Sequence, residues 1–177
     1  MMKIFTTQVT GHFNRILDQE ELQIEDSARL LAQAVVGAGS IYIYGHRELH
    51  GVVVEATIGS ERLDSAKPLF KENGDLVPLT SADRILLFSY TSIDEETITL
   101  AKKLQEKGIQ TIGVSALMKN EENGLDSITD LHIDSKLRQP LIPDDDGSRY
   151  GYPALMVALY VYYALRFTVK EILSEND

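Results

Sequence analysis

Hydrophobic residues recur at helical spacing at both ends of this 177-residue chain. Apolar positions three or four residues apart over 3–19, and again over 22–36, predict two successive amphipathic helices. A last helical pattern covers about 153–173 and begins at Pro153, a residue suited to the first position of a helix. Both ends of the chain are therefore predicted to be helical.

Short apolar runs rich in β-branched and aromatic residues predict strands in the middle of the chain. The stronger runs cover 40–44, 84–88, 109–114 and 131–134, and weaker extended pieces are expected near 61–65 and 75–80. Helical patterns over about 52–57 and 93–107 lie between them. Strands that alternate with helices favour a mostly parallel sheet, so the predicted fold class is α/β, a three-layer sandwich with helices flanking the sheet.

The stretch from Asp83 to Ser92 joins a predicted strand to a predicted helix. Its hydroxyl residues Ser89, Thr91 and Ser92 come where the strand ends, and a helix N-terminus attracts anions through its free N–H groups. These three residues are predicted to hold a phosphate. The alternative is that Ser92 only caps the helix while the others close turns, and the pattern does not choose between the two. Asp94 weighs against a phosphate, because its carboxylate competes for the same helix dipole.

A second candidate segment follows the first predicted strand. In a parallel sheet, Gly45, His46 and Arg47 would lie at the same carboxyl edge as the hydroxyl run and could donate hydrogen bonds to an anion. The alternative is an ordinary surface turn. His46 and His50 have the spacing of two metal ligands on a helix, but no third ligand is evident, so no metal site is predicted. Glu55, His12 and His132 are possible acid–base groups, and Glu55 is the one we select as the catalytic candidate.

Composition and charge narrow the possible functions. The chain has no cysteine, which excludes thiol catalysis and disulfides, and its formal net charge is -10. A net charge of that sign disfavours binding to nucleic acid or to an anionic membrane. We see no secretory leader and no apolar run of about 20 residues that could span a bilayer, so we expect a cytoplasmic protein. Arg149, before the last helix, is a further candidate anion partner.

The last predicted helix is apolar on almost every side from Ala154 to Tyr163. One helix of a domain this small cannot be enclosed on all sides by its own chain. We therefore expect the helix to form a subunit interface in a homodimer or homotetramer.

The order of these elements resembles the sugar isomerase (SIS) domain family, in particular its single-domain phosphoheptose-isomerase branch. The resemblance rests on the strand 40–45, on the strand and loop 83–92, on the helix and strand 101–114 and on the short strand 128–133. It implies one SIS-like domain over 1–177 with a flavodoxin-like or Rossmann-like topology. Its parts would be N-terminal helices at 1–38, a parallel α/β core at 40–134 and a C-terminal helix at 150–173.

The resemblance also implies a function. It suggests a sugar phosphate held by Ser89, Thr91 and Ser92, and aldose–ketose isomerisation with Glu55 as the base and no redox cofactor. The chain departs from the family pattern, since Ser92 replaces a glycine, Asp94 replaces a hydroxyl residue, and the last helix has no histidine. The alternative is a non-catalytic ligand sensor or assembly module. A dinucleotide-binding enzyme is disfavoured, because the Gly-Ala-Gly run at 37–39 precedes the first strand instead of following it.

Overall fold

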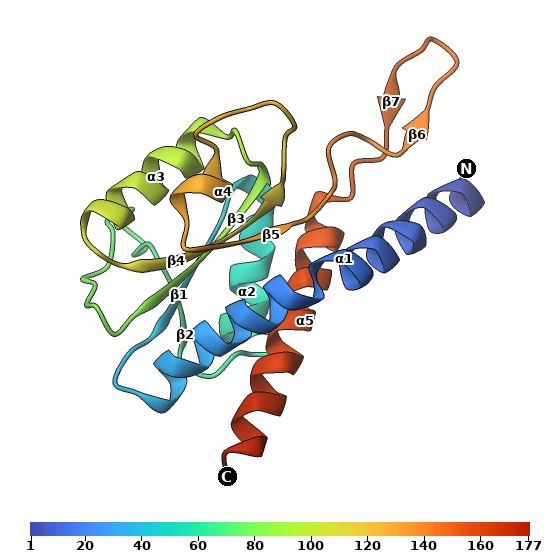
Figure 1. Ribbon diagram of the computed structural model, residues 1–177. Coiled ribbons are helices and arrows are strands. Elements are labelled where there is room, and N and C mark those ends of the chain that lie inside the picture. Colours follow the sequence, from blue (N-terminus) through green and yellow to red (C-terminus); the bar gives the residue numbers. More distant parts are fainter.

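The computed structural model describes residues 1–177 and has a five-stranded parallel sheet at its centre (Figure 1). The strand order is β2-β1-β3-β4-β5, with β2 at Ala66–Pro68, β1 at Ile41–Gly45, β3 at Arg84–Thr91, β4 at Gln110–Ala116 and β5 at Leu131–Asp134. Every neighbouring pair in this sheet is parallel. The predicted α/β class with a mostly parallel sheet is therefore confirmed.

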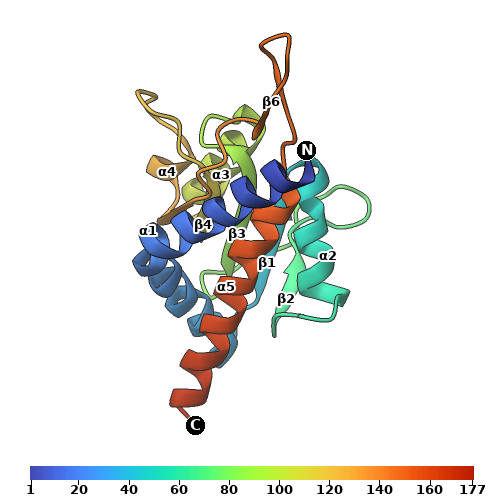
Figure 2. The same ribbon diagram turned by 90° about the vertical axis from the view of Figure 1, so that its right-hand side faces the viewer.

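Helices cover both faces of the sheet, as Figures 1 and 2 show. One face carries α1 (Met2–Val36), α2 (His50–Ile58) and α5 (Ala154–Glu175), and the other carries α3 (Glu95–Glu106) and the short α4 (Leu125–Ile128). Alternate residues of β3 divide between the two layers: Leu86 and Phe88 pack under α1 and α5, whereas Ile85 and Leu87 pack under α3. The result is the predicted three-layer sandwich.

The N-terminal region is one helix, which corrects the prediction of two. α1 runs for 35 residues without a break. The hydrophobic stripe weakens at Glu20, yet the residues around it are good helix formers, with neither glycine nor proline between 12 and 36. Glu20 faces the body of the protein, where its carboxylate accepts the backbone N–H of Asp134. A polar contact thus replaces an apolar one at this point of the stripe.

Several other boundaries differ from the prediction. The extended piece expected at 61–65 is displaced to β2, and that expected at 75–80 is reduced to a single bridge between Phe70 and Leu76. Strand β3 extends beyond its apolar run through polar residues to Thr91, and β4 extends to Ala116. A 3-10 turn, η1 (Arg47–Leu49), precedes α2, and a small hairpin of β6 (Ile142–Pro143) and β7 (Arg149–Tyr150) projects beside the start of α1 (Figure 1). No helix is long and apolar enough to cross a membrane.

Candidate functional site

The candidate site lies at the carboxyl edge of β1 and β3. These strands are neighbours in the sheet. The chain continues from β1 to β2 on one side of the pair and from β3 to β4 on the other side. Such a reversal of strand order leaves a crevice where α/β proteins commonly bind ligands. Gly45 pairs with Phe88, and the N–H of His46 donates to the carbonyl of Phe88 at 3.0 Å. The two segments singled out in the sequence, 45–47 and 89–94, therefore meet here.

The turn after β1 requires a glycine. A Cβ atom on Gly45 would lie 2.1 Å from the carbonyl oxygen of Leu49, far inside contact distance. Arg47 then adopts a left-handed backbone with φ 51°, which is unusual for a residue with a side chain. This tight turn keeps His46 buried while Arg47 stays exposed.

The carboxylate of Asp94 is the centre of the polar network. Its Oδ2 accepts the hydroxyl of Ser89 at 2.7 Å and that of Thr97 at 3.2 Å, and it lies 3.3 Å from Nε2 of His46. Its Oδ1 accepts the N–H of Glu96 at 3.2 Å. Two of the groups expected to hold an external anion, Ser89 and His46, therefore contact an anion that belongs to the protein itself.

Asp94, not Ser92, is the N-cap of α3, so the alternative in which Ser92 caps this helix is wrong. Ser92 is 1% exposed, and its Oγ accepts the N–H of Met118 at 3.0 Å. The chain leaves β3 later than the apolar run suggests, because the strand continues to Thr91. That extension moves the start of the helix beyond Ser92 and gives Ser92 a role in joining two loops.

Aromatic rings form one wall of the site. The ring of Tyr90 contacts His46 edge-on at 5.3 Å and Tyr152 at 5.6 Å between centroids. The hydroxyl of Tyr90 donates to the carboxylate of Glu48. Burial and this hydrogen bond raise the pKa of Tyr90 to about 12, so the phenol keeps its proton at neutral pH. Glu96 lies on the other side of His46, 3.4 Å from Nδ1.

These groups surround an open pocket of about 590 Å³, which we call the switch-point pocket. Its lining combines two arginines, two tyrosines and several hydrogen-bonding groups: His46, Arg47, Tyr90, Thr91, Asp94, Arg138, Gln139, Pro140 and Tyr152. The cations suit an anionic group, and the flat rings suit the face of a sugar-sized molecule. The sequence prediction missed Arg138 and Tyr152. The one available signal was that Arg138 follows a strand at the same edge of the sheet; Tyr152 had none.

Some candidate residues lie outside this pocket. Glu55, on α2, accepts the N–H of Glu61 at 2.9 Å, and this bond ties α2 to the loop before β2. Ser89 is buried beneath the pocket with its hydroxyl bonded to Asp94. His50 begins α2 as an exposed residue. No group of three potential metal ligands occurs in the structure.

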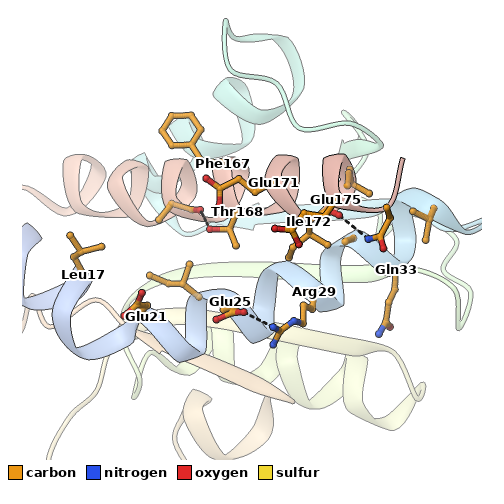
Figure 3. Close-up of a pocket in the computed structure, with 16 residues that line it drawn as sticks. Leu17, Glu21, Glu25, Arg29, Gln33, Phe167, Thr168, Glu171, Ile172 and Glu175 are labelled. Atoms are coloured by element: carbon orange, nitrogen blue, oxygen red, sulfur yellow. Dashed lines mark hydrogen bonds and ion pairs between the residues drawn. The ribbon is translucent and has the colours of Figure 1, made fainter.

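A larger groove of about 800 Å³ lies between α1 and α5 on the opposite side of the molecule from α3 (Figure 3). Its apolar side chains include Leu17 and Phe167, each 52% exposed. Figure 3 shows acidic residues of both helices and Arg29 along its borders. The helix that the sequence identified as apolar on all sides thus leaves one side uncovered in a single chain.

Comparison with known proteins identifies the family. Residues 1–173 match the family model described as "Domain of unknown function (DUF2529)". This chain belongs to the DUF2529 family. It is 54% identical over 175 residues to "Uncharacterized protein YwjG" of Bacillus subtilis (strain 168), with 99% of each chain covered.

Solved structures relate the DUF2529 fold to SIS-like proteins. The protein MJ1247 from Methanococcus jannaschii, for which the function of a 3-hexulose-6-phosphate isomerase was inferred, has a TM-score of 0.64 and 15% identity, covering 97% of this chain and 90% of its own. The Vibrio vulnificus NanR protein, complexed with ManNAc-6P, has a TM-score of 0.63 and 12% identity, covering 98% of this chain and 63% of its own. At these identities the likeness shows the fold, which is SIS-like.

Proposed function

We propose that the protein binds a sugar phosphate in the switch-point pocket. The observation that carries this proposal is the lining of that pocket, where two arginines and two tyrosines gather at the strand reversal of an SIS-like sheet. The complex of NanR with ManNAc-6P, a protein of similar fold, supports the same class of ligand. Phosphate oxygens would bind Arg47 and Arg138, while Tyr90 and Tyr152 would contact the sugar.

The hydroxyl segment would have a smaller role than its sequence suggests. Thr91 and His46 line the pocket and stay candidates to bind the ligand. Gly45 is a candidate only through the turn that positions His46 and Arg47. Ser89 and Ser92 already have internal partners, and Asp94 would repel a phosphate placed against them. The hydroxyl groups of a sugar, by contrast, can donate to the Asp94 carboxylate. We therefore place the sugar, not its phosphate, nearest to Asp94.

Isomerisation of the phosphoheptose type is the finer proposal, with Glu55 as its base and no redox cofactor. The alternative is a ligand sensor without turnover. The bond from the N–H of Glu61 to the Glu55 carboxylate favours the sensor, because a base must reach the reacting carbon. An aldose–ketose assay on the purified protein separates the two, with Glu55→Gln as the control. Turnover that depends on Glu55 would exclude the sensor.

We also propose that a second copy of the chain covers the groove between α1 and α5, giving a homodimer or homotetramer. The exposed apolar side chains of Leu17 and Phe167 support this interface. Light scattering after size exclusion tests it, with Phe167→Glu expected to yield monomers. A monomeric wild type would contradict it. The cytoplasmic location expected from the sequence stays a prediction.

Thermal shift at fixed ionic strength tests the proposed ligand. The panel compares the phosphates of sedoheptulose, fructose, glucosamine and N-acetylmuramic acid with the free sugars and inorganic phosphate. A ligand at about 100 times its dissociation constant stabilises by about 2.7 kcal/mol, on the order of 5–10 °C for this size of domain. Arg47→Gln should abolish the part of the shift by which a sugar phosphate exceeds inorganic phosphate, and Lys102→Gln, an equal charge change on the exposed side of α3, should preserve it. The proposal would be refuted if no sugar phosphate raised the Tm by more than inorganic phosphate does.

A further inference from the structure

A second, smaller cavity lies behind the segment 138–140. This segment lines both the cavity and the switch-point pocket. Its volume is about 230 Å³. One wall is a face of α1 formed by Gln8, His12 and Arg15, which follow one another at helical spacing. The other walls are the segment 136–141 and Arg149 of β7. We call it the basic cavity.

The basic cavity concentrates positive charge in an acidic protein. Of the chain's 17 lysines and arginines, four line this one cavity: Arg15, Lys136, Arg138 and Arg149. The carboxylates paired with them are Glu20 and Asp134. The ammonium of Lys136 is 3.5 Å from Asp134 and 4.0 Å from Glu20, longer than a charge-assisted hydrogen bond of about 2.8 Å. The cavity thus keeps an excess of cationic donors.

Each arginine is held on one side by a neutral acceptor. Arg149 donates from Nε to the carbonyl of Pro140 at 2.8 Å and from Nη2 to that of Leu141 at 3.0 Å. Arg138 donates from Nε to the carbonyl of Leu117 at 2.8 Å. A guanidinium has five N–H donors, so these bonds fix its position and leave further donors for a ligand.

His12 anchors the third arginine. It is 1% exposed, and its Nε2–H donates to the carbonyl of Ser135 at 2.6 Å. Nδ1 is then free to accept a bond from Nη2 of Arg15 at 3.1 Å. Burial, and to a smaller extent the charges of Arg15 and Lys136, lower the pKa of His12, which keeps the ring neutral and the bond intact. Arg15 is therefore placed by a fixed tautomer and not by an opposite charge.

We propose that the basic cavity binds a phosphoryl dianion, either inorganic phosphate or the phosphate of a small monoester. Several anchored cations around a small space match a compact dianion, which accepts hydrogen bonds on every oxygen. The small volume and the acidic surroundings disfavour an extended polyanion such as nucleic acid. This site shares Arg138 with the switch-point pocket but is distinct from the sugar-phosphate site proposed there, since Arg15, Lys136 and Arg149 line only the basic cavity.

Calorimetric titration with inorganic phosphate at constant ionic strength tests the proposal on wild type, Arg15→Gln and the double variant Arg15→Gln, Lys136→Gln. Arg15 is exposed, so its replacement should leave the fold intact. Each variant should bind phosphate at least about tenfold more weakly, because one charge-assisted hydrogen bond is typically worth that factor. Lys102→Gln should bind within about twofold of wild type, as expected for an exposed surface charge.

The same titration with a monoester, glycerol 3-phosphate, shows whether the site accepts a substituent. The imidazole of His12, followed by NMR, should titrate at higher pH when phosphate is bound, because the anion offsets the cations beside it. The proposal would be overturned if the wild-type protein showed no saturable binding of phosphate. Phosphate binding that Arg47→Gln removes and Arg15→Gln spares would also overturn it, since the anion would then occupy the switch-point pocket.

Discussion

Replacing Asp94 by serine should weaken the fold and strengthen phosphate binding at once. Asp94 accepts hydroxyl bonds from Ser89, which is 5% exposed, and Thr97, which is fully buried. Serine and aspartate are about equal as N-caps, so the capping term should change little. A hydrogen bond to a charged group is worth about 1.5–3 kcal/mol, but water can reach this partly exposed carboxylate. We expect the variant to lose about 2–3 kcal/mol, a fall in Tm of roughly 4–12 °C.

The effect on binding should have the opposite sign. Two unit charges about 4 Å apart repel by about 4 kcal/mol at an effective dielectric constant near 20, and solvent at this open pocket reduces that figure. Removing the carboxylate of Asp94 also frees the Ser89 and Thr97 hydroxyls. Affinity for inorganic phosphate in the switch-point pocket should therefore rise at least about tenfold.

The assay combines thermal unfolding with phosphate titration in an Arg15→Gln background, which weakens phosphate binding to the basic cavity. Asp94→Asn is the matched control, because an amide fills the same space and still presents an oxygen to the capping N–H. It should lose less stability than the serine variant and gain less affinity. A serine variant as stable as wild type, or one with no gain in phosphate affinity, would refute the view that Asp94 occupies an anion site.

Three further predictions concern the scaffold and its pH dependence. Gly45→Ala should abolish folding or shift the turn after β1, since its Cβ would lie 2.1 Å from a carbonyl oxygen, and circular dichroism would detect the loss. Asp83→Ala should cost about 3–4 kcal/mol in urea unfolding, because this buried carboxylate accepts two backbone N–H groups at 2.7 and 2.8 Å; a loss below about 1 kcal/mol would contradict this. Burial lowers the pKa of both His12 and His132, so the unfolded chain binds more protons and stability falls as pH drops through the ordinary histidine pKa. Stability should therefore be lower at pH 5.5 than at pH 7.5 in urea unfolding, and His12→Gln should reduce this pH dependence.

The periodicity of the chain was enough to predict the α/β class and most elements of the core. Hydrophobic spacing reports which side of a helix or strand is buried, and this property is local. It failed where a buried polar contact interrupts an apolar stripe, as at Glu20 in the middle of α1. It also misplaced the start of α3, because polar residues up to Thr91 continue a strand whose apolar part ends at Phe88.

The sequence alone also determined that the segments 45–47 and 89–94 would meet, since the carboxyl ends of parallel strands share one edge of the sheet. Only the tertiary structure determined which side chains contact one another where these segments meet. It placed Asp94 among donors from β3, α3 and the turn after β1, and it brought in Arg138 and Tyr152 from beyond β5. The physical reason is that hydrophobic pattern encodes burial of each element, whereas the partner of a polar side chain depends on how distant segments pack together.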